Sequence, residues 1–501
     1  MFGTSHHAST HQQPSQQLAR AMGEVQVMRP PASARPRVVL LCSPCMGHLI
    51  PFTELARRLV ADHGMAATLL FAAATSPPSE QYLAVAAAVP DGVDLVALPA
   101  PPPDALPAST PVRDRAAHAV VYGVPRVRDV ARALAEAGPL AALVVDMIGV
   151  PARGVAAELG VPFYMFFTSP WMTLSLFLHL PELDAMVAGE YRDATEPIRL
   201  PGCVPIHAQE LPPSMVADRS SDRYAGFLSM AKDITGVDGF LVNTFTELEP
   251  AVGDGMDGMG LPVHPVGPLV WTRPVCMDRD HECLRWLDQQ PRGSVVYVSF
   301  GSGGTLTWQQ TAELALGLEL TKRRFIWAVK RPHESATNGE FFGTKNGEDT
   351  ALDFLPKGFI ERIRGVGLVT LSWAPQTSIL RHASIGCFVT HCGWNSTLEG
   401  IMNGVPMVAW PLYAEQNMNA AMLEVQVGVA SRIKVDADGF ISKEEIANAI
   451  GRVMEGEESE RMRKQASELK QKSVQALKSD GCSTHALAEV VNIWKCIASG
   501  K

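Results

Sequence analysis

Short apolar runs alternate with amphipathic stretches along most of the chain. The first run, at 38–41, is typical of a buried parallel strand, and the helix predicted after it has apolar residues at i, i+3, i+4 and i+7: Phe52, Leu55, Ala56 and Leu59. The unit recurs with a strand at 140–145, a short helix at 152–159 and a strand at 162–167. Strands that alternate with helices predict a parallel sheet covered on both faces.

The same pattern starts again after Pro268. An amphipathic helix is expected at 307–320, and strands are expected at 294–300, 325–329, 367–371, 385–389 and 407–409. We therefore expect an α/β fold with two Rossmann-like domains that face one another. In such sheets ligands bind beyond the carboxyl ends of the strands, so the cleft between the domains is the expected site.

The length of 501 residues also favours two domains over a single core. Residues 1–36 are rich in Gln, His, Ser and Pro and lack apolar periodicity, which predicts a disordered N-terminal extension. We assign 37–268 to an N-terminal domain, 269–290 to a linker and 291–480 to a C-terminal domain.

Charge and cysteine content narrow the classes of function. The net charge of −9 leaves no electrostatic footprint for nucleic acid, so an anionic ligand has to be held by local devices such as helix N-termini. Nine scattered cysteines and the lack of a secretory signal favour a reduced, cytoplasmic setting. Cys42 and Cys45 form one CxxC, but no second CxxC completes a zinc tetrad.

The longest uncharged stretch, 161–180, approaches the length of a membrane span. Pro162 and Pro170 interrupt it, so it is better explained by a buried strand followed by a core helix. We therefore expect no membrane anchor.

One segment of the second half has the pattern of an anion site. The strand at 385–389 runs into a tight turn, and a helix opens at Trp394 and closes at Asn403 and Gly404. Free N–H groups and the helix dipole would face a ligand there, and three polar side chains could cradle a diphosphate without a lysine or a metal: His391, Asn395 and Ser396. The alternative is a capping box of Ser396 and Glu399, which would satisfy this helix end without any ligand.

The 44 residues at 373–416 carry a resemblance that favours the ligand. Their opening Trp-Ala-Pro-Gln, their His-Cys-Gly-Trp-Asn-Ser core, Glu399 and the closing Glu-Gln resemble the plant secondary-product glycosyltransferase box of the family 1 UDP-glycosyltransferases. The resemblance extends over about 37–490. It implies the GT-B architecture, with an acceptor-binding first domain, a UDP-sugar-binding second domain and a final helix in 481–501 that packs back on the first.

The family resemblance implies a role for each polar position of the donor site. Trp373 would stack on uracil, with Ala374 and Gln376 beside it, and Glu399 would accept hydrogen bonds from the ribose. The diphosphate would lie against Ser302, His391, Asn395 and Ser396. The sugar hydroxyls would be read by Trp394, Glu415 and Gln416. Glutamine at the end of the box resembles the glucose-using pattern, while many relatives have Asp in place of Glu415.

Transfer to a hydroxyl requires a base, and histidine suits that role at neutral pH. His48 follows the first strand and is expected in a loop before the first helix, at the carboxyl edge of the sheet, and its surroundings at 43–51 resemble the family's base motif. Asp146 ends the strand at 140–145. A helix cap would explain it too, but the resemblance makes Asp146 the partner that orients the base.

The expected reaction is a single displacement with inversion, in which UDP-glucose and a small lipophilic acceptor yield a β-O-glucoside with no metal and no further cofactor. The glycine loop at 301–306 and the string at 410–416 look most like the hydroquinone and monolignol glucosyltransferases. A phenol or phenylpropanoid is therefore the expected acceptor. Candidate pocket residues are Cys45, Met46, Met147 and Trp171.

Several alternatives remain beside this one. Flavonoids and hormone-like or aromatic acids are the alternative acceptors, and a non-catalytic UDP-sugar-binding protein is the alternative class. A nicotinamide oxidoreductase is disfavoured, because the loop after the first strand lacks G-x-G-x-x-G. We expect the chain to act as a monomer.

Overall fold

The computed structural model describes residues 35–72, 85, 89, 91–102, 104–107, 110, 112–251, 260–271, 281–333, 352–371 and 374–500. All but the last two residues of the extension expected over 1–36 lie outside these ranges, and so does part of the linker expected over 269–290.

The first half of the chain forms a seven-stranded parallel sheet, in the order β3-β2-β1-β4-β5-β6-β7. Its strands are β1 (Arg37–Cys42), β2 (Ala66–Phe71), β3 (Val93–Ala97), β4 (Leu140–Val145), β5 (Phe163–Phe167), β6 (Gly239–Val242) and β7 (Val263–Pro265). Its helices are α2 (Met46–Ala61), α4 (Val112–Ala137), α5 (Arg153–Leu159), α6 (Trp171–Met186) and α7 (Asp222–Asp233), with short 3₁₀ turns η1 (Val150–Ala152), η2 (Tyr191–Asp193), η3 (Ala208–Glu210) and η4 (Ile234–Gly236).

The second half forms a six-stranded parallel sheet, in the order β10-β9-β8-β11-β12-β13. Its strands are β8 (Val295–Ser299), β9 (Arg324–Val329), β10 (Gly367–Leu371), β11 (Ile385–Thr390), β12 (Met407–Ala409) and β13 (Ala430–Arg432). Its helices are α9 (Glu282–Leu287), α10 (Trp308–Leu320), α11 (Phe359–Arg362), α12 (Gln376–Arg381), α13 (Trp394–Asn403), α14 (Gln416–Ala421), the π-helix η6 (Met422–Val427), α15 (Lys443–Met454), α16 (Gly456–Ala476) and α17 (Cys482–Ala498).

The alternation of strands and helices predicted from the sequence is confirmed. The expected strands at 140–145, 367–371 and 407–409 coincide with β4, β10 and β12. Five strands were not predicted: β2, β3, β6, β7 and β13. Two of them, β7 and β13, have only three residues each and carry little periodic signal. In β3 the charged Asp94 interrupts the apolar run, and it pairs with Arg37 of β1.

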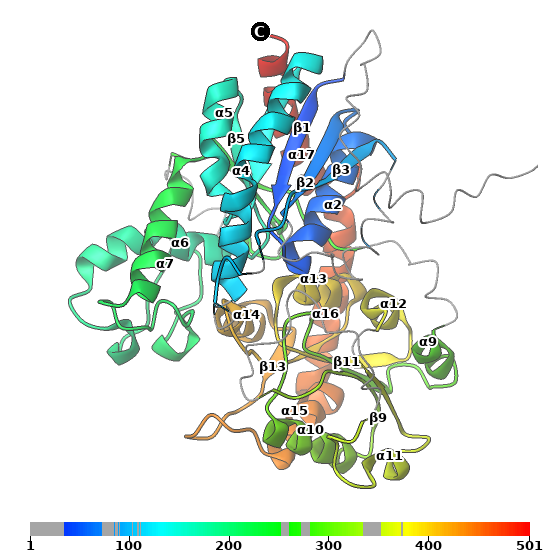
Figure 1. Cartoon of the computed structure of the whole chain (residues 1–501). Coiled ribbons are helices and arrows are strands. Elements are labelled where there is room, and N and C mark those ends of the chain that lie inside the picture. The colour runs from blue at the N-terminus through cyan, green and yellow to red at the C-terminus, as the bar shows by residue number, and fades with distance from the viewer. Residues whose placement is uncertain are drawn as a thin grey trace, which may run out of the picture.

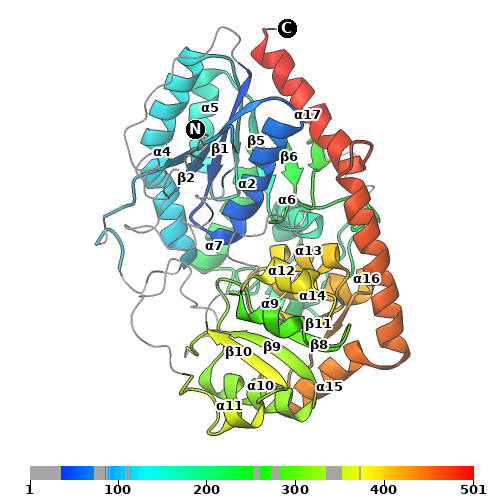
Figure 2. The same cartoon turned by 90° about the vertical axis from the view of Figure 1, so that its right-hand side faces the viewer.

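The two sheets lie one above the other, with α13 and α14 of the second half facing the first (Figure 1). On one side of the molecule α16 and α17 form a long column that leads from the second half back to the first (Figure 2). Helix α17 packs against β4 and β7. Its Trp494 is fully buried and meets the ring of Tyr164 edge-on, with 5.2 Å between the centroids. The end of the chain therefore completes the core of the first half.

Candidate active site

His48 and Asp146 lie together at the carboxyl edge of the first sheet. The Nδ1 atom of His48 is 2.8 Å from Oδ2 of Asp146. The carboxylate is 1% exposed, whereas the imidazole is 21% exposed. Because Nδ1 is engaged by the carboxylate, Nε2 is the nitrogen that remains for proton transfer.

Hydrogen bonds hold the Asp146 carboxylate on both sides. The N–H of Ser43 donates to Oδ2 at 2.8 Å, and the N–H groups of Ile148 and Gly149 donate to Oδ1 at 3.0 Å each. Burial by itself would raise the pKa of this carboxyl, but the bonds from His48 and Ser43 hold it below its ordinary value. Asp146 is thus ionised at neutral pH. Sequence reasoning did not single out Ser43, which donates its backbone N–H to Asp146 and whose Oγ lies 3.0 Å from Nδ1 of His48. Its place at the start of the base motif was the signal that could have identified it.

His48 lies in the first turn of helix α2, and the expectation of a loop there was wrong. The helix begins at Met46 and continues through Pro51. Proline lacks the N–H that would bond the carbonyl of Gly47 four residues earlier. That carbonyl instead accepts a hydrogen bond from Nδ2 of Asn395, at 2.8 Å, so the turn that holds His48 contacts the start of α13 directly.

Helix α13 begins and ends where the sequence predicts. Its N-cap is Gly393, which has no side chain to close the helix end, and its C-cap is Gly404 in the left-handed region. The ring of His391 packs so closely against Gly301 and Gly393 that a Cβ atom at either position would overlap it. Burial, with a smaller effect of Lys330, lowers the pKa of His391 to about 3. The imidazole is therefore neutral, with one N–H to donate, and its Nδ1 has no partner among the described residues.

The capping box considered for Ser396 and Glu399 does not form. The helix starts two residues before Ser396, and both side chains instead accept hydrogen bonds from Nε2 of Gln376, at 3.0 Å and 2.7 Å. Burial raises the pKa of Glu399 to about 7, and the bond from Gln376 opposes that rise. The structure thus joins three of the expected donor-binding residues, and it leaves the N-terminus of α13 without a side-chain cap.

The glycine loop after β8 brings Gly301 against the ring of His391, and Ser302 is the next residue of that loop. Lys330, just after β9, donates from Nζ to the carbonyl of Gly301 at 2.7 Å and also to that of Ser302. A lysine therefore lies beside the cradle, which the sequence analysis did not foresee. A small cavity adjoins the loop and extends to Lys330. Lys330 follows a predicted strand at its carboxyl end, and that position was the signal that could have identified it.

Two of the three expected sugar-reading residues contact the first half of the chain. The indole N–H of Trp394 donates to the carbonyl of Asn243 at 2.7 Å. That bond uses the only polar atom of the side chain, so a hydrogen bond from Trp394 to a sugar hydroxyl has to come from its backbone. Oε1 of Glu415 accepts from Oγ of Ser169 at 3.1 Å.

The side chain of Gln416, the third of these residues, is oriented by the turn that precedes it. Its Oε1 accepts the N–H groups of Leu412 and Tyr413, which leaves the amide Nε2 to donate. Trp373, expected at the uracil, lies outside the described residues, whereas Ala374 is described and buried.

The four acceptor-pocket candidates differ in exposure. Cys45, Met46 and Met147 are partly exposed beside the His48 and Asp146 pair, whereas Trp171 at the start of α6 is buried in the core. Burial, with Asp146 adding to it, raises the pKa of the Cys45 thiol to about 12, so this cysteine is not a thiolate nucleophile at neutral pH.

The eight cysteines of the described ranges are free. Within those ranges no group of three or more His, Cys, Asp or Glu side chains could hold a metal ion. No helix in the part of the chain that the structure describes is long and apolar enough to cross a membrane.

Comparison with known proteins gives a consistent result. Residues 274–477 match the family model described as UDP-glucoronosyl and UDP-glucosyl transferase. The chain is 46% identical over 464 residues to a hydroquinone glucosyltransferase of Rauvolfia serpentina, a match that covers 92% of this chain and 98% of that protein.

Two solved structures have the same GT-B fold. One is a UDP-glucosyltransferase from Polygonum tinctorium that glucosylates indoxyl, in complex with 3,4-dichloroaniline, with a TM-score of 0.83, 40% identity and coverage of 93% of this chain and 100% of that one. The other is UGT2 of Phytolacca americana with UDP-2fluoro-glucose and pterostilbene, with a TM-score of 0.82, 38% identity and the same coverage.

Proposed function

Because the chain belongs to the UDP-glycosyltransferase family, we propose that it transfers glucose from UDP-glucose to the hydroxyl of a small phenolic acceptor. One observation carries the proposal. Nδ2 of Asn395, at the start of the donor helix α13, is bonded to the carbonyl of Gly47, the neighbour of His48. The candidate base and the candidate diphosphate cradle thus belong to one contiguous site.

His48 is the proposed catalytic base. Its Nε2 takes the proton of the acceptor hydroxyl while the oxygen forms a bond to the anomeric carbon, and the bond from that carbon to the diphosphate breaks on the opposite face. UDP leaves with the bonding electrons, so an α-linked donor gives a β-O-glucoside. Asp146 stabilises the imidazolium that forms, which its short bond to Nδ1 and its depressed pKa support.

The leaving UDP is stabilised by groups that are already in place. The uncapped N-terminus of α13 offers free N–H groups and the positive end of the helix dipole, and neutral His391 and the amide of Asn395 add donors. Ser302, Ser396, Gln376 and Glu399 are the remaining proposed donor contacts. This set supports a transfer that needs no divalent ion.

The acceptor class is proposed from the relatives. The similar proteins are named for hydroquinone and indoxyl or hold pterostilbene and 3,4-dichloroaniline, all of them small aromatic molecules. The partly exposed Met46 and Met147 beside the base suit an aromatic ring. A cytoplasmic location, supported by the free cysteines, and a monomeric state complete the proposal.

The test is the release of UDP from UDP-glucose with hydroquinone, coniferyl alcohol, a flavonol or an aromatic acid, in EDTA and without added metal. We expect the fastest release with one of the two simple phenols, undiminished by EDTA. His48→Ala should lower kcat at least about 100-fold, since a base contributes roughly that much, with the Kd of UDP changed less than about twofold.

The control is His485→Ala, which removes an exposed histidine of α17 and should leave activity intact. Binding of UDP without release in the presence of any acceptor would show a binding protein rather than an enzyme. Loss of release in EDTA would contradict the metal-free mechanism.

A further inference from the structure

The segment from α14 to β13 belongs to the second half of the chain, but residues of the first half form hydrogen bonds with it at three places. At its start Ser169 donates to Glu415. In the π-helix η6 the amide of Gln426 donates to the carbonyl of Gly202 at 3.4 Å. At its end Nη1 of Arg432 lies 2.8 Å from Oε1 of Glu210, in the turn η3. The residues expected to read the sugar, Glu415 and Gln416, open this segment.

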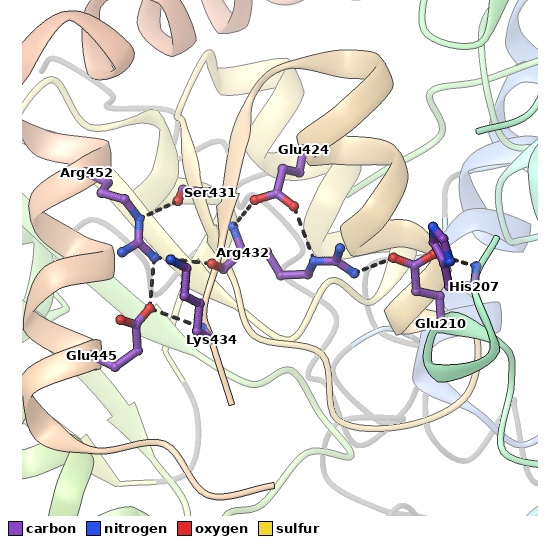
Figure 3. Close-up of polar contacts among 8 residues, drawn as sticks. All are labelled: His207, Glu210, Glu424, Ser431, Arg432, Lys434, Glu445 and Arg452. Atoms are coloured by element: carbon purple, nitrogen blue, oxygen red, sulfur yellow. Dashed lines mark hydrogen bonds and ion pairs between the residues drawn. The ribbon is translucent and has the colours of Figure 1, made fainter. Parts of the chain in front are cut away.

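Glu210 is a buried carboxylate with both oxygens engaged. Its side chain is 4% exposed. Oε1 accepts from Arg432, and Oε2 accepts from the N–H of His207 at 2.9 Å, which closes the turn η3 (Figure 3). A buried charge is costly unless its geometry is fully matched, so this pair favours one docking arrangement of the two halves over displaced ones.

Arg432 is fixed to its own segment as well. Glu424 of η6 accepts from the N–H of Arg432 at 2.9 Å and lies 3.3 Å from its Nε. On the other side of β13, Arg452 bonds Ser431, the carbonyl of Arg432 and Glu445 (Figure 3). Because the guanidinium has little freedom to move, its bond to Glu210 fixes η6 and β13 together relative to the turn η3.

The turn η3 also packs directly on α14. The first residue of that helix is Gln416, whose Oε1 holds the turn at Leu412 and Tyr413. A displacement of α14 against the first half would therefore move Glu415 and Gln416 together.

We propose that Glu210 and Arg432 are positioning residues for the donor sugar: their ion pair sets the place of α14 and so aims Glu415 and Gln416 at the hydroxyls of the sugar. The inference rests on the proposed function for the identity of that sugar. It does not extend to the nucleotide, whose proposed contacts lie on α12, on α13, in the turn at His391 before α13 and in the glycine loop. Specificity for the sugar thus depends on a residue of the first half that lies outside the donor site.

The experiment compares Glu210→Gln with Glu445→Gln. Both remove a carboxylate that pairs with an arginine of the same network, but Glu445 pairs with Arg452 inside the second half (2.9 Å), so it serves as the matched control. The readouts are the Kd values of UDP and of UDP-glucose by calorimetry, KM and kcat with hydroquinone, and Tm. Arg432→Lys is the second variant. It keeps the charge but loses the guanidinium, which contacts Glu210 through Nη1 and Glu424 through Nε.

For Glu210→Gln we expect the KM and Kd of UDP-glucose to rise about 5- to 20-fold while the Kd of UDP stays within twofold. Glu445→Gln should change neither affinity. The rise in the Kd of UDP-glucose for Arg432→Lys should lie between those for Glu210→Gln and Glu445→Gln. A Kd of UDP-glucose within twofold of the wild type in Glu210→Gln would overturn the proposal. An equal loss for UDP and UDP-glucose would overturn it too, because that indicates general loosening of the two halves.

Failure of the proposed function is a separate result. It would appear as wild-type protein that transfers no glucose to any acceptor, whereas the ratio of the two Kd values can be measured without an acceptor. If wild-type protein bound UDP and UDP-glucose equally, no sugar would be read and this inference would be wrong.

Discussion

Asp146 uses its two oxygens for different purposes. Oδ1 closes the turn after β4 through the N–H groups of Ile148 and Gly149, as a capping residue would, while Oδ2 holds His48. The two explanations that the sequence left open are thus compatible. A carboxylate fixed on one side by backbone donors has little freedom to rotate, so it also fixes the imidazole that it bonds.

Glu399 gives a prediction about pH at the scale of one residue. In the ligand-free protein burial raises its pKa from 4.5 to about 7, so the folded state keeps a proton that the unfolded chain releases between these values. The stabilising contribution of this group is complete below pH 4.5 and is lost as the pH rises through 7. The difference is of the order of 3 kcal/mol.

Glu399→Gln should therefore gain stability relative to the wild type between pH 5 and pH 8. Unfolding by denaturant of the ligand-free proteins at several pH values measures this difference. The exposed Glu468→Gln on α16 is the control and should show a constant difference. Parallel stability profiles of the wild type and Glu399→Gln would refute the prediction.

At the scale of one element, helix α13 has a glycine at each end, and the two glycines have different roles. Gly404 ends it in the left-handed conformation, at φ 69°, which most residues avoid. Gly393 begins it with an ordinary φ of −61°, and what it provides is room for the ring of His391. Gly404 therefore matters for the stability of the helix, whereas Gly393 matters for the geometry of the ligand site.

The two alanine variants should therefore separate these roles. Gly393→Ala should displace His391 and raise the Kd of UDP at least about 10-fold with a small change in stability, because one charge-assisted hydrogen bond is worth roughly that factor. Gly404→Ala should cost about 1 kcal/mol of stability and leave the Kd of UDP unchanged. Calorimetry and thermal unfolding of both variants provide the check, and equal effects of the two on UDP binding would contradict it.

At the scale of the whole molecule, the first half needs the end of the chain to complete its core. Helix α17 follows the second half in sequence but fills the core of the first, where Lys495 donates to the carbonyl of His63 at 2.7 Å and Arg58 to Thr484 at 2.7 Å. The stability of the first half thus depends on the last helix of the chain.

Trp494→Ala tests this dependence. Removing a fully buried tryptophan should cost about 3–5 kcal/mol, and the loss should fall on the first sheet. Hydrogen exchange should therefore quicken in β4 and β7 before it quickens in β8 and β11. Val474→Ala, at an exposed position of α16, is the control and should leave exchange unchanged. Faster exchange in the second sheet alone would contradict this account.

The sequence by itself determined the elements with strong local patterns. Apolar runs and helix-ending residues placed β4, β10, β12 and α13, because a buried strand and a capped helix each leave their signal within a few neighbouring residues. The donor box and the base motif made the family recognisable, because their residues are contiguous.

Only the tertiary structure decided what depends on residues far apart in the chain. Pro51 can lie within α2 because Asn395, 348 residues after Gly47, takes up the carbonyl that proline leaves free. The indole of Trp394 turned to Asn243, and Glu415 met Ser169, because the two halves close on one another. Glu210 and Arg432 are unremarkable as a glutamate and an arginine in the sequence. The burial of Glu210 and its pairing with Arg432 arise from the docking of the two halves, which no local pattern encodes.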